Sequence, residues 1–210
     1  MPRDESTLSP DPEERLLRAG FSRDGDNDAF IVQSLRERRA RQRVLALRAG
    51  NRRGLLDDED WERALGDPDV DVRREALSLL AYVDDVDGEL LGLVRGLLED
   101  GDALVVDAAI FTLGEHLDAD AVTRLAEIAL EHEDARCRES AVAALGVLGD
   151  DRGRAAVLAA LDDKPPVRRR AIVALSNFEG PDVDAALTLA AQDRDWQVRA
   201  AVDQLNKDLD

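Results

Sequence analysis

The sequence is poor in the residues that build disulfides, metal centres and aromatic-rich β-sheets. It has one cysteine, two histidines and seven aromatic residues among 210 positions. The single cysteine, Cys137, cannot form an internal disulfide, which fits a reducing compartment. Low aromatic content argues against a β-sandwich or barrel, whose strands favour aromatic and β-branched side chains.

Long apolar runs are also missing. No stretch approaches the 18 residues that a transmembrane helix needs. The segment from Met1 to Glu5 has no apolar stretch behind a basic one, so no secretory signal is visible. We therefore expect a cytoplasmic protein with no membrane partner.

Acidic residues dominate the charged positions, with 46 acidic against 28 basic residues and a formal net charge of −18. The acidic residues are 31 Asp and 15 Glu, and the basic residues are 26 Arg and two Lys. This bias resembles that of salt-accumulating halophiles, because a Debye length of about 3 Å in molar salt screens such a surface. We expect helical structure to be lost in dilute buffer. The alternative is an ordinary acidic protein from a GC-rich genome.

One segment opposes this charge. Residues 36–53 hold eight arginines and one acid, Glu37, which gives +7 over 18 residues and leaves −25 on the other 192. Such a local asymmetry indicates an interaction surface or an internal ion-pair network.

A repeat of about 31 residues decides the fold. Each unit has an acidic turn, an apolar anchor residue, often an arginine, and then a run rich in Ala and Leu. Successive anchors lie 33, 32, 30 and 31 residues apart: Val72, Val105, Cys137, Val167 and Val198. Apolar residues at offsets 0, 4, 5 and 8 from each anchor form one stripe of an amphipathic helix.

A second helical pattern lies between successive anchors, so each unit is a helix–turn–helix. Acidic residues precede many of these helices, where carboxylates accept free amide protons. A two-helix unit cannot bury both faces alone, so the units must stack. We predict an all-α fold, an α-solenoid of stacked antiparallel helix pairs.

The repeats resemble HEAT repeats, specifically the short armadillo-like helical type first noted in phycocyanobilin lyases. The shared signature is Leu-x-Asp-x-Asp-x-x-Val-Arg-x-x-Ala-x-x-Ala-Leu, over roughly residues 57–210. Four units carry its anchor and arginine: Val72-Arg73, Cys137-Arg138, Val167-Arg168 and Val198-Arg199. The resemblance implies a ladder in which each arginine bonds to a turn Asp of an adjacent repeat. The expected acceptors are Asp67 or Asp69, Asp134, Asp162 and Asp195, with an interruption where Val106 replaces Arg.

Three segments follow from the patterns. Residues 1–12 are polar and Pro-containing, and we predict a disordered tail. Residues 13–56 form an N-terminal helical cap, with a divergent Arg-rich repeat over 28–53, and residues 57–210 hold five HEAT-like repeats. Terminal repeats need one polar outer face, which the cap supplies.

Catalytic and metal-binding motifs are sparse, and we predict no enzyme activity, cofactor or metal. His132 precedes Cys137 by five residues, but Cys137 replaces the usual Val and is interpreted as a small buried hydrophobe. The His-Glu pairs of the related deoxyhypusine hydroxylase are absent from their register. The acidic run 24–28 resembles the start of a calcium loop, but Ala29 and Leu35 stand where such a loop needs Gly and Glu. The run is therefore interpreted as a turn that caps the next helix.

Offsets 2 and 6 from each anchor avoid the apolar stripe and should face outward on the concave side. Offset 2 holds Arg74, Arg169 and two acids, Asp107 and Glu139, and offset 6 includes Phe111. Phe111 is either an interface anchor, since aromatic residues and Arg dominate interfaces, or part of the inter-repeat core. Trp61 and Trp196 begin helices and are interpreted as structural plugs between repeats.

Three interpretations remain for the Arg-rich segment: docking of an acidic protein, an internal salt-bridged cap, or clamping of nucleic-acid phosphates. We predict a non-catalytic scaffold that binds a protein partner through the concave face and the Arg cluster. The alternatives are a nucleic-acid-associated adaptor and a bilin-lyase-like accessory protein. The contact candidates are Arg36, Arg38, Arg39, Arg41, Arg43, Arg74, Phe111, Arg169 and Arg170.

Overall fold

The predicted all-α fold is confirmed by the structure, a computed structural model that describes residues 11–22 and 25–209. Within these residues there are thirteen α-helices and no strand. The segment 1–10, which includes most of the predicted disordered tail, lies outside the described residues. Asp11 and Pro12, which the sequence assigns to that tail, instead cap and begin the first helix.

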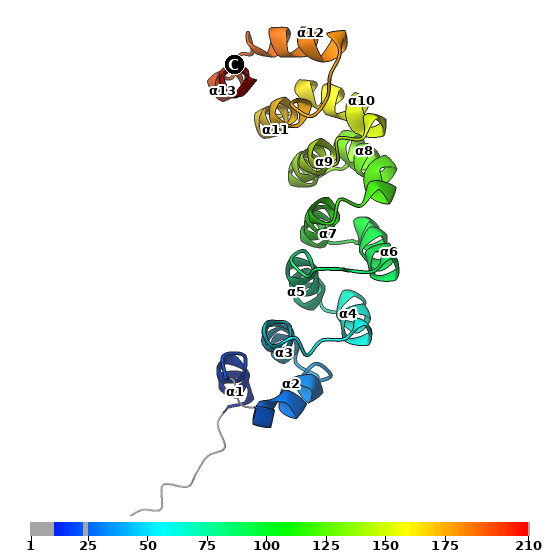
Figure 1. The fold of residues 1–210 in the computed structure, drawn as a ribbon, viewed down its shortest axis with the longest axis vertical. Helices are drawn as coiled ribbons and strands as arrows, with labels where there is room; N and C mark the ends of the chain where they lie inside the picture. Colours follow the sequence, from blue (N-terminus) through cyan, green and yellow to red (C-terminus); the bar gives the residue numbers. More distant parts are fainter. Residues whose placement is uncertain (1–10, 23–24, 210) are drawn as a thin grey trace, which may run out of the picture. The chain divides into compact units, whose positions relative to one another are not determined.

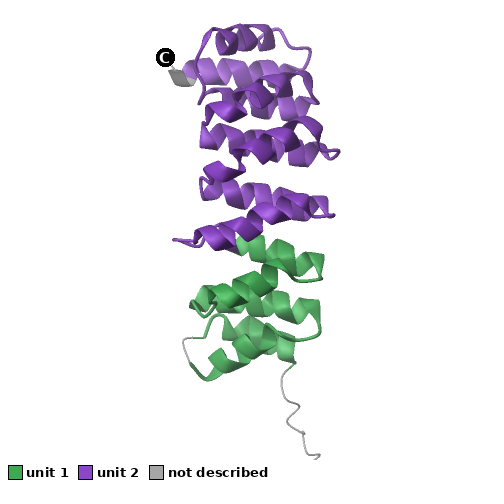
Figure 2. Cartoon of the chain, turned by 90° about the vertical axis from the view of Figure 1, so that its right-hand side faces the viewer, with its two compact units in different colours: residues 1–79 green, residues 80–210 purple. Residues whose placement is uncertain are grey.

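The chain divides into two compact units, residues 1–79 and 80–210 (Figure 2). The helices of the first are α1 (Pro12–Ala19), α2 (Asp28–Ser34), α3 (Ala40–Arg53), α4 (Asp58–Leu65) and α5 (Val70–Leu80), whose last residue belongs to the second unit. The helices of the second are α6 (Gly88–Gly96), α7 (Ala103–Glu115), α8 (Val122–Glu131), α9 (Ala135–Leu148), α10 (Asp151–Ala159), α11 (Pro165–Leu175), α12 (Pro181–Ala190) and α13 (Trp196–Leu209).

Helix pairs repeat through the second unit. The first helices α6, α8, α10 and α12 lie on one side, and the second helices α7, α9, α11 and α13 lie on the other (Figure 1). Helix α9 packs against α7, α8 and α11, so each second helix contacts its own partner and its neighbours in the stack. We call the outward side of α7, α9, α11 and α13 the second-helix face of this unit.

The predicted apolar stripe forms the core. All five anchors, Val72, Val105, Cys137, Val167 and Val198, are at most 1% exposed. The Ala and Leu residues at offsets 4 and 8 are buried with them, including Ala141 and Leu145 of α9. Burial of this stripe is the main favourable term in the stacking of the repeats.

Aspartate caps begin most helices, as the sequence predicted. The carboxylate accepts an amide proton of the first turn in α4, α6, α7, α9 and α10, from Asp57, Asp87, Asp102, Asp134 and Asp150. The acidic run before α2 differs from this expectation. Asn27 precedes α2 without a side-chain cap, and Asp28 pairs with Arg53 at 2.7 Å.

The N-terminal helices of the first unit pack on α3. Both α1 and α2 contact it, and Leu16 of α1 is fully buried. The guanidinium of Arg15 lies 3.9 Å from the ring centroid of Phe30, which ties α1 to α2. The segment 28–53 contains the helices α2 and α3, and α1 packs beside them as a third helix.

The two tryptophans have different environments. Trp61 is 4% exposed and packs in the core, as predicted. Trp196 is 67% exposed at the start of α13, so the prediction that it plugs the repeats is wrong. Its place two residues before the buried anchor Val198 turns it away from the apolar stripe.

Candidate functional site

An arginine of one repeat binds an aspartate of the next through two parallel bonds. Arg138 donates to Asp163 at 2.6 and 2.8 Å, and Arg168 donates to Asp193 at 2.9 and 2.7 Å. Each guanidinium also donates to a carbonyl just before its own helix. These bonds hold the pKa values of Asp163 and Asp193 below their usual range.

This ladder has the predicted form but different acceptors. The arginines bind Asp163 and Asp193 in place of the expected Asp162 and Asp195. Asp134 is not an acceptor from another repeat: it binds Arg136, two residues along the chain, which lowers its pKa to about 2.

The Arg-rich segment holds a pair of the same kind within the first unit. Arg43 binds Asp67, one of the two expected acceptors, with two bonds of 2.7 Å, and both side chains are largely buried. Four more arginines pair with acids from other elements, namely Arg36 with Asp60, Arg41 with Glu13, Arg48 with Glu75 and Arg53 with Asp28.

The remaining arginines of the segment differ. Arg52 stacks on the Phe21 ring at 3.9 Å. Arg38 and Arg39 are exposed, and their side chains have no ion pair within the described part of the chain. Most of the +7 segment is thus neutralised inside the first unit, and two arginines before α3 remain open to solvent.

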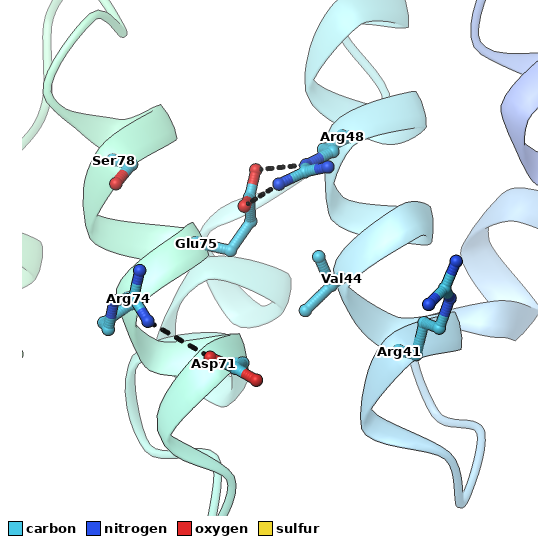
Figure 3. Close-up of a pocket in the computed structure, with 7 residues that line it drawn as sticks. All are labelled: Arg41, Val44, Arg48, Asp71, Arg74, Glu75 and Ser78. Atoms are coloured by element: carbon cyan, nitrogen blue, oxygen red, sulfur yellow. Dashed lines mark hydrogen bonds and ion pairs between the residues drawn. The ribbon is translucent and has the colours of Figure 1, made fainter.

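A polar groove of about 330 Å³ lies between α3 and α5 in the first unit (Figure 3). The candidate residues Arg41 and Arg74 line it. Arg48 makes bonds of 2.7 and 2.6 Å to Glu75, and Arg74 bonds to Asp71 at 3.2 Å. Figure 3 shows both pairs beside Val44, the one apolar side chain of the groove. Because its charges are already paired, this groove offers little to a further ion.

A more apolar groove of about 260 Å³ lies on the second-helix face between α7 and α9. Phe111 lines it and is 44% exposed, so it does not lie in the inter-repeat core. Val147 of α9 is 61% exposed on the same groove. Two carboxylates, Glu115 and Glu139, and the guanidinium of Arg170 supply its charges.

An adjoining groove of about 300 Å³ brings the other candidate arginines to the same face. It shares Glu139 and Arg170 with the first groove and adds Arg169 and Val173 of α11. Arg169 donates to the Gln197 side chain at 2.9 Å, and Arg170 lies 3.8 Å from Glu139. Phe111, Arg169 and Arg170 therefore lie on one continuous surface, which Arg74 of the first unit does not line.

Sequence reasoning missed Val147, although its position carries a signal. It follows the anchor Cys137 by ten residues, and at 100° per residue that offset lies on the same side of the helix as offsets 2 and 6.

The groups that first invite a catalytic interpretation are engaged structurally. Cys137 is fully buried, and burial raises the pKa of its thiol to about 11. A ring nitrogen of His116 bonds to the Leu80 carbonyl, and a ring nitrogen of His132 accepts the Asp134 amide proton. No group of three His, Cys, Asp or Glu side chains that could hold a metal ion occurs in the described residues. In the same residues, no helix combines the length and apolar character that crossing a membrane requires.

Charge is distributed unevenly between the units. The first has 18 acidic and 15 basic residues, a net charge of −3, and the second has 28 and 13, a net charge of −15. The second-helix face of residues 80–210 therefore lies in a strongly negative field.

The fold is similar to solved repeat structures. An engineered protein has a TM-score of 0.63 and 18% identity, with 86% of this chain and 95% of that chain covered. The X-ray structure of YibA from Escherichia coli gives 0.63 and 16%, covering 96% and 75%. A designed armadillo repeat protein in complex with the peptide (KR)4 gives 0.58 and 14%, covering 92% and 97%.

Sequence comparison gives the family. A search of curated proteins gave no match. The pattern of HEAT repeats matches residues 59–146 and 122–206, which together span more than half of the chain. The chain, with its buried anchors and its arginine–aspartate ladder, belongs to the HEAT repeat family.

Proposed function

We propose that this chain is a non-catalytic scaffold that binds a protein partner on the second-helix face of residues 80–210. The observation that carries the proposal is the exposed apolar column on that face. Phe111, Val147 and Val173 are 44%, 61% and 55% exposed on α7, α9 and α11, and they line two adjoining grooves. Exposed apolar side chains that lie together mark interaction sites, whereas single ones need no explanation.

The repeat architecture supports a protein partner. Stacked repeats present an extended surface to which several units contribute, and such surfaces are used for binding. The grooves are flanked by arginines, Arg169 and Arg170, and contain an aromatic residue, Phe111, the residue types that dominate interface energetics.

The N-terminal arginines have a smaller role in this proposal than the sequence implied. Arg43 pairs with Asp67, and Arg36 and Arg41 pair with acids of their own unit. Arg38 and Arg39 are left as a small basic contact for an acidic partner. The same internal pairing disfavours the nucleic-acid alternative, because guanidinium groups held by carboxylates release few counterions from a phosphate backbone.

Site-specific photo-crosslinking in cells of the source organism tests the proposal. A benzophenone side chain replaces Val173 on the second-helix face, and the control replaces Leu130, which is 53% exposed at the end of α8. We expect one discrete protein adduct from position 173 and none from position 130. The adduct is then identified by mass spectrometry and its purified protein is tested for binding. Equal adducts from both positions, or failure of the purified protein to bind, would overturn the proposal.

A further inference from the structure

The Phe111 ring has a different stacking partner from those of Phe21 and Phe30. Arg52 covers Phe21 and Arg15 covers Phe30, each with a guanidinium 3.9 Å from the ring centroid. Phe111 has instead an aromatic neighbour, Tyr82, with ring centroids 6.0 Å apart and planes tilted by 59°. Within the described residues no guanidinium stacks on this pair, and Tyr82 is 73% exposed.

The groove beside this ring is lined by more carboxylates than guanidinium groups. Glu115 follows Phe111 by one helical turn, is exposed, and has no ion pair in the described part of the chain. Glu139, across the groove on α9, has the 3.8 Å contact with Arg170 as its one ion pair within residues 11–22 and 25–209. The lining thus carries two carboxylates and one guanidinium, and it lies in a unit with a net charge of −15.

The groove has the dimensions of a site for one side chain. Its volume of about 260 Å³ is below the range of about 300–1,000 Å³ that is typical of sites for drug-sized ligands. Its lining combines the small or apolar residues Gly114, Ala143, Ala144 and Val147 with the charged side chains of Glu115, Glu139 and Arg170. A long basic side chain suits such a site, because its methylene groups cover apolar surface while its charged end reaches the carboxylates.

We propose that the groove between α7 and α9 binds an arginine side chain from an extended segment of the partner protein. The guanidinium stacks on the free face of Phe111 and pairs with Glu115 and Glu139, and its methylene groups pack on Val147. A cation over an aromatic ring is attracted by the ring quadrupole. This inference rests on the proposed function and specifies the chemistry of the partner.

The test is an NMR titration of the full-length ¹⁵N-labelled chain with two matched octapeptides. One alternates arginine and serine, and the other has citrulline, which is uncharged and nearly isosteric, in place of each arginine. We expect amide shifts centred on α7 and α9, and binding of the citrulline peptide weaker by at least about tenfold. Equal binding of both peptides, or shifts centred elsewhere, would overturn the inference.

A matched pair of double variants separates local from general electrostatics. Glu115→Gln with Glu139→Gln removes the two negative charges that line the groove. We expect this double variant to bind the arginine peptide at least about tenfold more weakly than the wild type. Glu131→Gln with Glu133→Gln removes the same charge from exposed positions at the end of α8, and we expect a change below about threefold. An equal loss of peptide affinity in both double variants would contradict a specific arginine site in the groove.

The outcomes also separate this inference from the proposed function. If position 173 crosslinks a partner that binds when purified, but the arginine peptide does not bind, the scaffold role stands and the arginine site is wrong. If no partner is crosslinked and the peptide does not bind, both are wrong.

Discussion

The guanidinium of Arg168 joins two repeats at one point. It donates two bonds to Asp193, at 2.9 and 2.7 Å, and a third to the Asp163 carbonyl at 2.8 Å. Arg168 is 4% exposed, so these bonds replace the hydrogen bonds to water that its charged group loses on burial. The carboxylate of Asp163 in turn accepts from Arg138 of the preceding repeat. The ladder therefore joins Arg138 of α9 to Arg168 of α11 through Asp163, and Arg168 to Arg199 of α13 through Asp193.

Removal of Arg168 should destabilise the second unit strongly. Arg168→Ala leaves Asp193 without its charge partner and opens space among buried residues, and we expect a loss of about 3 kcal/mol. Arg136→Ala is the matched control, because Arg136 pairs with Asp134 of its own turn in an exposed position. The urea midpoint of the helical circular dichroism signal measures both. Equal midpoints for the two variants would contradict the structural role of the ladder.

The Arg-rich segment offers a similar contrast in the first unit. Arg43→Ser breaks the largely buried pair with Asp67 and should cost about 3 kcal/mol. Arg39→Ser changes an exposed side chain without a described ion pair, and its effect should stay within about 0.5 kcal/mol. Thermal and urea unfolding provide the comparison. If Arg39→Ser proved as costly as Arg43→Ser, the pairing seen in the first unit would be incorrect.

Acid should weaken the second unit through its ladder aspartates. Hydrogen bonds from Arg138 and Arg168 lower the pKa values of Asp163 and Asp193 in the folded chain. A folded-state pKa below the unfolded value of about 3.9 adds stability above that pH, and this contribution is lost as the pH falls through the folded-state pKa.

Asp193→Asn tests this sign. The variant should be less stable than the wild type at pH 7. The difference should shrink as the pH falls from about 4 through the folded-state pKa of Asp193, because the wild-type carboxylate is progressively protonated over that range. Urea midpoints at intervals between pH 7 and pH 2 measure the difference. A constant difference over that range would show that the charge of Asp193 contributes nothing.

Two glycines should respond to alanine with opposite signs. At Gly146 of α9 a Cβ atom would lie 2.7 Å from the Ala174 Cα atom of α11, so the backbones must separate, and we expect Gly146→Ala to cost about 1–3 kcal/mol. At Gly96, which has helical dihedrals and open space, Gly96→Ala should stabilise by about 0.5–1 kcal/mol. Urea unfolding of both variants checks the close approach. Stabilisation by Gly146→Ala would contradict it.

The sequence predicted those parts of the fold that repeat. The anchor spacing identified each second helix and its buried stripe, because a periodic apolar pattern indicates directly which face of a helix is buried. The offsets also placed Phe111 on an outward position, and its 44% exposure agrees with that geometry. HEAT membership follows from the same pattern.

Pairings between repeats were harder to predict. Asp162 and Asp163 are adjacent, and only the backbone path shows that Asp163 lies opposite Arg138. Glu13 and Arg41 are far apart in sequence, so nothing in the local pattern of the Arg-rich segment indicated their 2.7 Å contact. The exposure of Trp196, by contrast, could be predicted from its position two residues before the anchor Val198. Charge partners depend on tertiary distance, which residue spacing alone does not provide.

The most direct test of the scaffold role is the affinity of the crosslinked partner, once purified, for wild type and for Phe111→Ala and Val173→Asp. Leu130→Ala serves as the control, and circular dichroism confirms that each variant is folded. The account predicts at least about tenfold weaker binding for each second-helix variant and no change for the control. Unchanged affinity in folded Phe111→Ala and Val173→Asp would contradict a binding role for this face.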